Sequence, residues 1–101
     1  MDKDQIIEIV KQYALKIKDI VAFDEISIFG SWAKGTATAE SDIDVAVLVK
    51  KEPEDFLGIE SSLWSRCIDV DLRIEPLLVV DKDDPAGFRN MAKRTGIPVS
   101  L

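Results

Sequence analysis

The chain has 101 residues, 47% of them apolar and 32% charged, and it carries a formal net charge of −6. This composition is typical of a soluble globular protein, and the length predicts a single domain over residues 1–101. No cluster of lysines and arginines offsets the negative charge, so we expect no direct binding of nucleic acid. The sequence contains no histidine, which excludes His-based zinc sites, Ser-His-Asp triads and histidine general bases.

The cysteine count and the lengths of the apolar runs indicate the cellular setting. One cysteine, Cys67, excludes an internal disulfide, and its place at the entry to an apolar run predicts a buried thiol. No apolar run approaches the length of a membrane span, and the acidic, amphipathic residues 1–10 differ from a signal peptide. We therefore expect the reducing cytoplasm, with no membrane contact.

In chain order, the first half predicts one helix, one strand and a short polar loop. Apolar residues recur at three- and four-residue steps over residues 4–18, which predicts an amphipathic helix. Residues 25–29 form an apolar run that predicts a strand, and a glycine ends it. Residues 32–35 then favour a single helical turn, and residues 36–41 are small, polar and aperiodic, as in a loop.

The second half predicts a further strand, helix, strand and helix. Apolar and polar residues alternate over 42–49, so one face of this strand is aliphatic and the other begins with two acids. The elements expected after it are a helix over 53–65, a strand over 68–75 with a short continuation over 77–80, a helix from 83 or 84 to about 94 and an edge strand over 97–99. This order predicts an α+β (α/β) fold, a small mixed sheet of three to four strands with helices packed on it.

Two pairs of acids are candidates for metal binding. Asp42 and Asp44 are two residues apart on a predicted strand, so their carboxylates point to the same face and repel each other. A divalent cation, Mg²⁺ or Mn²⁺, would relieve this repulsion. Asp69 and Asp71 repeat the spacing on the next predicted strand, and either could complete a three-carboxylate cluster for phosphoryl chemistry. Taken alone, each pair is more often the solvated face of a strand.

Four residues near the first acid pair suit a triphosphate. Gly30 allows close approach of the backbone to a phosphate, and Ser31 adds a hydroxyl donor, although a Gly-Ser after a strand is more often only a turn. Lys34 is within reach of the same phosphates, and Ser41 could orient the carboxylates as a hydrogen-bond donor.

The segment from Gly30-Ser31 through ten residues to Asp42-Ile43-Asp44 resembles the signature of the DNA polymerase β-like nucleotidyltransferase superfamily. The flanking residues resemble its minimal prokaryotic branch, the MNT proteins, and the resemblance covers nearly the whole chain. It implies the polymerase β-like nucleotidyltransferase fold, metal binding by both aspartates and triphosphate binding by Gly30 and Ser31. One departure is Lys34, which stands where many relatives carry arginine and so lacks the planar guanidinium.

The resemblance also implies a third carboxylate in the strand after the second helix, in a pattern like Val70-Asp71-Leu72. It therefore favours Asp71 as the third catalytic, metal-binding acid, with Asp69 as the alternative. The substrates it implies are ATP, with Mg²⁺ or Mn²⁺, and a hydroxyl acceptor.

Partners are implied only by the resemblance. Minimal members are often encoded beside a small helical HEPN protein, and in some pairs they act as antitoxins by transferring AMP to a tyrosine of that partner. The sequence stops where larger members continue into a helical domain that selects the base or the acceptor, so we expect a partner or a second copy to supply acceptor binding. Two other hypotheses are a catalytically vestigial antitoxin that acts by contact and an enzyme that modifies RNA, which the lack of a basic patch disfavours.

Overall fold

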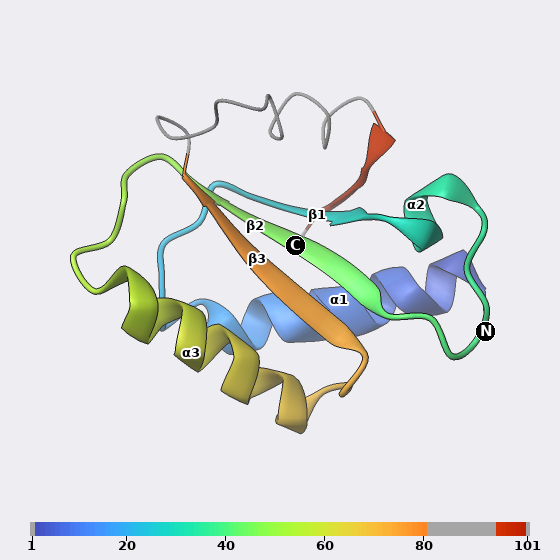
Figure 1. The fold of residues 1–101 in the computed structure, drawn as a ribbon, viewed down its shortest axis with the longest axis horizontal. Coiled ribbons are helices and arrows are strands. Elements are labelled where there is room, and N and C mark those ends of the chain that lie inside the picture. Colours follow the sequence, from blue (N-terminus) through green and yellow to red (C-terminus); the bar gives the residue numbers. More distant parts are fainter. Residues whose placement is uncertain (1, 81–94, 101) are drawn as a thin grey trace.

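The computed structural model describes residues 2–80 and 95–100. Its elements alternate between helices and strands along the chain (Figure 1). In order they are α1 (Lys3–Ile17), β1 (Glu25–Phe29), α2 (Ser31–Lys34), β2 (Ile43–Val49), α3 (Phe56–Arg66), the 3₁₀ turn η1 (Cys67–Asp69), β3 (Ile74–Val80) and β4 (Ile97–Val99). In this part of the chain, four strands form one mixed sheet in the order β3-β2-β1-β4. The predicted α+β class and strand number are therefore confirmed.

The sheet is mixed because β2 and β3 run parallel, whereas β1 pairs antiparallel with both β2 and β4. The helix α3 provides the crossover that a parallel pair requires. As a result, the end of β1 and the starts of β2 and β3 meet at one side of the sheet, next to α2 (Figure 1).

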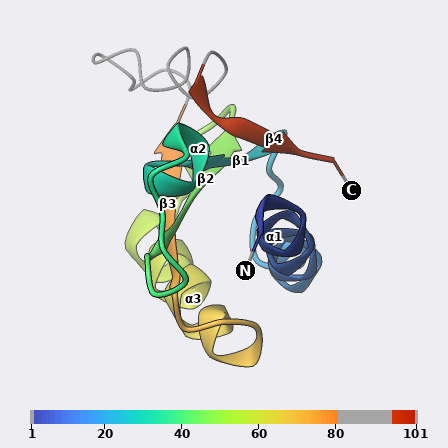
Figure 2. The ribbon, with the colours of Figure 1, turned by 90° about the vertical axis from the view of Figure 1, so that its right-hand side faces the viewer.

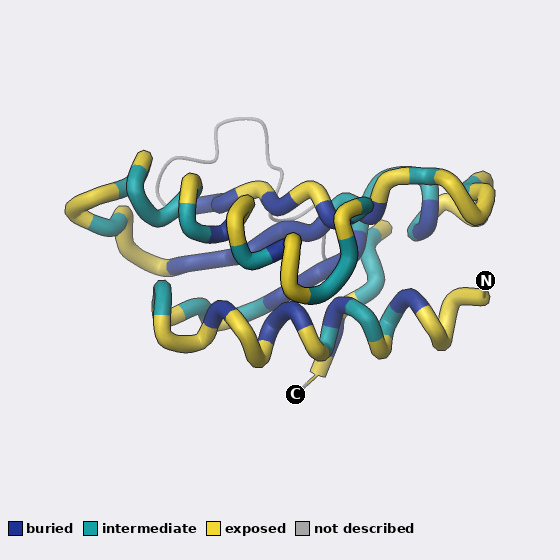
Figure 3. Tube along the Cα trace, turned by 90° about the horizontal axis from the view of Figure 1, so that it is seen from below, coloured by how far each residue is buried: buried dark blue, intermediate teal, exposed yellow. Residues whose placement is uncertain are grey.

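The main core lies between one face of the sheet and the helices α1 and α3. Figure 2 shows α1 to one side of the sheet, and Figure 3 shows its buried positions on the side that faces the strands. The aliphatic face predicted for β2 is fully part of this core, because Ile43, Val45 and Val47 have no exposed surface. Ala46, Leu48 and Val79 form a second, smaller cluster on the opposite face.

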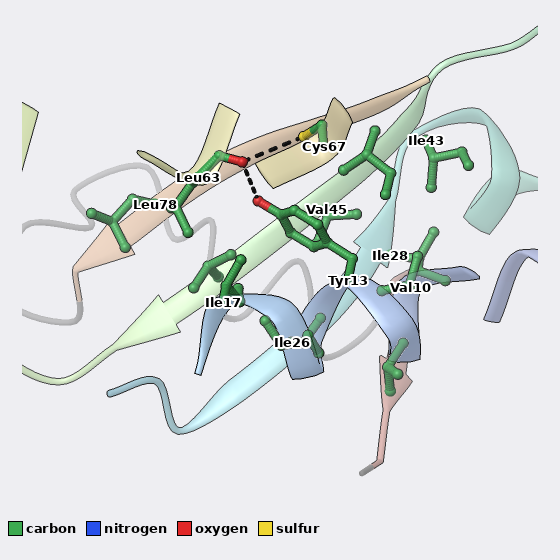
Figure 4. Packing of buried hydrophobic residues seen from close by; sticks show 14 of the residues in the cluster. Val10, Tyr13, Ile17, Ile26, Ile28, Ile43, Val45, Leu63, Cys67 and Leu78 are labelled. Carbon is green, nitrogen blue, oxygen red and sulfur yellow. Dashed lines mark hydrogen bonds between the residues drawn. The ribbon is translucent and has the colours of Figure 1, made fainter. Parts of the chain in front are cut away.

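A buried polar contact joins the two helices within the core (Figure 4). The Tyr13 hydroxyl donates to the Leu63 carbonyl at 2.8 Å, and the Cys67 thiol donates to the same oxygen at 3.4 Å. Burial raises the pKa of Tyr13 above its ordinary value and also raises the pKa of Cys67. Cys67 is thus a buried thiol, as predicted, and Tyr13 is a core residue with a satisfied hydroxyl.

Most predicted boundaries agree with the structure, with two exceptions in the second half. The helix predicted over 53–65 begins later, at Phe56, because the Asp55 side chain accepts a hydrogen bond from the Gly58 amide and caps it there.

The edge strand expected over 97–99 is present as β4. The helix predicted from 83 or 84 to 94 lies outside the described residues. Among those that are described, no helix is long and apolar enough to cross a membrane.

The third strand was wrongly predicted over 68–75. The amides of Val70 and Asp71 both donate to the Cys67 carbonyl, so the chain continues from α3 in a tight turn and leaves Ile68 exposed. The strand starts only at Ile74 and runs through Pro76, which an edge strand tolerates because one side of it needs no donors. The alternation of apolar and acidic residues over 68–75 was therefore misleading.

Candidate active site

Three carboxylates, those of Asp42, Asp44 and Glu75, lie near the side of the sheet where β2 begins. Asp42 directly precedes β2, and Asp44 is its second residue. In the strand register, Asp44 pairs with Phe29 of β1 on one side and with Glu75 of β3 on the other. Because paired residues project to the same face of a sheet, Asp44 and Glu75 lie side by side. Asp42 lies just outside the strand but close enough for its charge to act on both of them.

The proximity of these acids changes their ionisation. Burial raises the pKa of Asp44, and the charge of Asp42 raises it further, while a hydrogen bond with Glu75 opposes these effects. Burial, the charge of Asp42 and the hydrogen bond to Asp44 all raise the pKa of Glu75. The two carboxyl groups are thus close neighbours on adjacent strands, and both have raised pKa values. Such a pair favours the binding of a positive charge, which would relieve the repulsion between the ionised carboxylates.

Gly30 lies directly against this acid pair. Its backbone has φ 70° and ψ −145°, a conformation that is essentially restricted to glycine. A Cβ atom at this position would overlap the Asp44 carboxylate and would lie 3.1 Å from its Cγ atom. The turn that ends β1 therefore depends on glycine twice, for its backbone angles and for the space that the Asp44 side chain occupies.

The predicted helical turn follows Gly30 and carries two of the expected nucleotide-binding residues. It is α2, in which the Lys34 amide donates to the Gly30 carbonyl at 3.0 Å. Ser31 begins this turn, and Lys34 ends it with an exposed side chain. The structure therefore brings Gly30 and Ser31 to the side of the sheet that carries Asp44, with Lys34 one helical turn further on.

Ser41 stabilises the loop before β2. Its hydroxyl accepts a hydrogen bond from the Thr38 amide at 2.8 Å, and its own amide donates to the Thr38 carbonyl at 3.1 Å. These bonds close a turn just before Asp42. Ser41 therefore contributes to the position of the first acid through the backbone.

Asp71 lies in the turn before β3, apart from the pair formed by Asp44 and Glu75. It accepts hydrogen bonds from the Arg73 side chain, at 3.0 Å from Nε and 2.7 Å from NH2, and from the Arg73 amide at 2.9 Å. These hydrogen bonds lower the pKa of Asp71, so its negative charge is already compensated. Asp69 is exposed in η1.

Sequence reasoning missed Glu75 because it assigned the third strand too early. The available indication was the uninterrupted apolar run 77–80, which is typical of a buried strand but was predicted only as a short continuation of one. Starting the strand near this run would have brought Glu75, rather than Asp71, beside the acids of β2.

The donor set suits a divalent cation, although the side chains do not enclose one as they stand. Over residues 2–80 and 95–100, no three acidic or thiol side chains converge in a geometry that could hold a metal ion. The carboxylates of Asp44 and Glu75, with Asp42 nearby, are nevertheless the hard oxygen donors that Mg²⁺ and Mn²⁺ prefer. Mg²⁺ commonly takes one or two carboxylates together with substrate phosphates, so a complete cage of protein ligands is not required.

Two cavities lie at the other end of β1 and β2. Their volumes are about 580 and 490 Å³, and both are lined by residues 21–24. Neither includes any of the three acids. The acids are therefore the reason to place the candidate active site at the α2 end of the sheet.

A small mixed sheet with a glycine turn packed against a carboxylate at the start of its second strand is the arrangement expected from the resemblance to nucleotidyltransferases. The chain belongs to the polymerase beta nucleotidyltransferase family, whose model matches residues 4–98. It is an enzyme of this class, and the expected family membership is confirmed.

Two proteins of Methanocaldococcus jannaschii are similar in sequence. One, named "Putative protein adenylyltransferase MJ0141", is 43% identical over 102 aligned positions, which cover 94% of this chain and 99% of the relative. Another, named "Putative protein adenylyltransferase MJ1305", is 33% identical, and the match covers 82% of this chain but only 60% of that longer protein. A crystal structure titled as a "putative nucleotidyltransferase" from Sulfolobus solfataricus shares the fold, with a TM-score of 0.68, 18% identity and coverage of 95% of this chain and 80% of that one.

Proposed function

We propose that the protein transfers a nucleoside monophosphate, AMP from ATP, to a hydroxyl group of a partner protein with the help of Mg²⁺ or Mn²⁺. The observation that carries this proposal is the pair of Asp44 and Glu75, which lie in register on neighbouring strands beside Asp42, with Asp44 packed against the Gly30 turn. The names of the two relatives support AMP as the transferred group and a protein as the acceptor.

The proposal assigns metal binding to Asp42, Asp44 and Glu75. Glu75 replaces Asp71 as the third carboxylate, because Asp71 already pairs with Arg73, whereas Glu75 is in register with Asp44. The bound metal would neutralise charge on the triphosphate and on the leaving pyrophosphate.

The remaining residues bind the substrate and accept the proton. Gly30 and Ser31 lie beside Asp44, where the triphosphate must approach the metal ligands, and the Lys34 ammonium adds positive charge nearby. Glu75 is more exposed than Asp44, so it is the better placed of the two to accept the proton of the attacking hydroxyl.

The transfer can be tested with ATP labelled at either the α- or the γ-phosphate, Mg²⁺ and the product of the neighbouring gene. We expect label on that protein from the α-phosphate only, and none with the Asp44→Asn variant. Label from the γ-phosphate would indicate phosphoryl transfer. No label from either position, while Asp44→Asn still binds ATP as well as the parent protein, would reject the proposal.

A second candidate is a contact antitoxin whose site is vestigial, with a helical HEPN-type protein as its partner. The net charge of −6 favours a basic partner and supports this candidate. It predicts that a variant with Asp42→Asn and Asp44→Asn still neutralises the partner. Loss of neutralisation while the complex stays intact would favour the enzymatic mechanism instead.

A further inference from the structure

The side chain of Arg73 connects two segments that are distant in sequence. Its NH2 and Nε atoms donate to the two oxygens of Asp71, at 2.7 and 3.0 Å, and its NH1 atom donates to the Ala39 carbonyl at 2.8 Å. The side chains of the ion pair are largely buried, with 22% of Arg73 and 18% of Asp71 exposed. The planar guanidinium thus links the turn before β3 to the loop before β2.

Both linked segments lead into the proposed metal site. Ala39 lies three residues before Asp42, in a loop that has neither helical nor strand structure. Arg73 lies two residues before Glu75, and its carbonyl accepts a hydrogen bond from the Ile43 amide at 2.8 Å. The contact between Arg73 and Ala39 is therefore at the point where the acid-bearing segments of β2 and β3 enter the sheet.

We propose that Asp71 and Arg73 are positioning residues, which fix the place of Asp42 relative to Asp44 and Glu75. This inference rests on the proposed metal site. Asp44 and Glu75 are held by the strand register, but Asp42 lies outside β2 and depends on the loop before it. Asp71 holds the guanidinium in one orientation, and that orientation directs NH1 to Ala39.

The fork geometry of arginine is essential to this role. Lysine could retain a charge contact with Asp71, but it cannot bind both carboxylate oxygens and a carbonyl in one plane. Residues that orient metal ligands typically change metal affinity by about 10–100-fold when they are replaced. We therefore expect loss of the Arg73 side chain to weaken metal binding, while the three metal-binding carboxylates stay in place.

The chain offers a matched control in Arg66. This arginine also donates to an aspartate, Asp19, at 3.1 Å and to a backbone carbonyl, that of Lys16. Its partners lie at the end of α1 and just beyond it, away from the acids, and the pair is more exposed, at 35% and 70% of the two side chains. Arg66→Gln therefore removes the same kind of contact without any expected effect on the metal site.

The test compares Arg73→Gln, Arg73→Lys and Asp71→Asn with Arg66→Gln and the parent chain. Mn²⁺ affinity is measured by electron paramagnetic resonance in the absence of nucleotide, and hydrogen exchange is measured at the amides of Thr38 and Ser41. We expect roughly tenfold weaker Mn²⁺ binding in the three site variants, faster exchange at both amides, and neither change in Arg66→Gln. Arg73→Lys keeps the positive charge, so the same loss of Mn²⁺ affinity in this variant assigns the loss to the planar, multidentate guanidinium rather than to the charge.

The outcomes separate this proposal from the proposed function. Equal Mn²⁺ affinity in Arg73→Gln and Arg66→Gln would overturn the positioning role. Absence of Mn²⁺ binding by the parent chain would reject the metal site itself, and unchanged exchange at Thr38 and Ser41 would then also reject the link to the loop. If Arg73→Gln fails to fold, Arg73→Lys and Asp71→Asn decide the question by the same two measurements.

Discussion

Replacing Gly30 by alanine tests how closely the Gly30 turn and the Asp44 carboxylate are packed. The backbone at Gly30, with φ 70° and ψ −145°, costs a residue with a Cβ about 1–3 kcal/mol. The new Cβ would also overlap the Asp44 carboxylate, so this side chain must rotate away from its place beside Glu75. We expect Gly30→Ala to lose about 3 kcal/mol of unfolding free energy, at the upper end of this range.

Gly35 provides the matched control, because it also has a positive φ, 78°, but no atom lies within 4 Å of the position of its missing Cβ. Gly35→Ala should therefore lose only the strain of the left-handed conformation, about 1 kcal/mol. Urea unfolding measures both losses. A domain of this size typically has several kcal/mol to spare, so both variants should remain folded.

The decisive comparison between the two variants is the binding of Mn²⁺ at equal folded fraction. We expect Gly30→Ala to bind Mn²⁺ at least about tenfold more weakly than the parent protein, because Asp44 is displaced, and Gly35→Ala to bind it normally. Equal affinity in the two variants would show that the position of Asp44 against Gly30 does not matter for the metal, and it would refute this reasoning.

Three further predictions follow from the same contacts. Burial and neighbouring charge raise the pKa values of Asp44 and Glu75. The contribution of these two groups to the unfolding free energy is therefore complete below the ordinary carboxyl pKa of about 4, and it is lost as the pH rises through the raised pKa values. In urea unfolding without metal, the unfolding free energy of Glu75→Gln should therefore rise relative to that of the parent protein from pH 5 to pH 8. A difference that stays constant over this range would contradict the interaction of Asp44 with Glu75. Mn²⁺ at a hundredfold excess over its dissociation constant should stabilise the parent chain by about 2.7 kcal/mol in thermal unfolding, and should leave Asp44→Asn unchanged. Tyr13→Phe should lower the unfolding free energy by about 1–2 kcal/mol, because it leaves the Leu63 carbonyl without its 2.8 Å hydrogen bond, and a neutral effect would show that this contact is not stabilising.

The sequence predicted the parts of the fold that depend on local patterns. The strand over 25–29 and the two faces of the strand that follows Asp42 are visible as runs and alternation, because burial on one side selects for them. The pair Asp42 and Asp44 was proposed as a site for the same reason, since residues two apart on a predicted strand share a face.

The third carboxylate could not be assigned with the same certainty, because it depends on how two distant strands align. Asp71 and Glu75 both occur in the acid-bearing segment 69–75, and only the register of β3 against β2 distinguishes them. Asp71 and Arg73 form an ion pair in the turn, and the strand begins only after it, at Ile74. Such a side-chain contact produces no periodic pattern in the sequence from which it could be predicted. The same limit explains why Ser41 was expected near the carboxylates, whereas its hydrogen bonds close the preceding turn.

The most direct test of the central claim compares Glu75→Gln with Asp71→Asn in transfer of label from the α-phosphate of ATP to the partner protein at saturating Mg²⁺. If Glu75 is the third carboxylate and Asp71 only positions the loop, Glu75→Gln yields no label even at saturating Mg²⁺, while Asp71→Asn still labels the partner. The account would be contradicted if Glu75→Gln transferred label at the parent rate while Asp71→Asn lost transfer. That result would identify Asp71 as the third carboxylate.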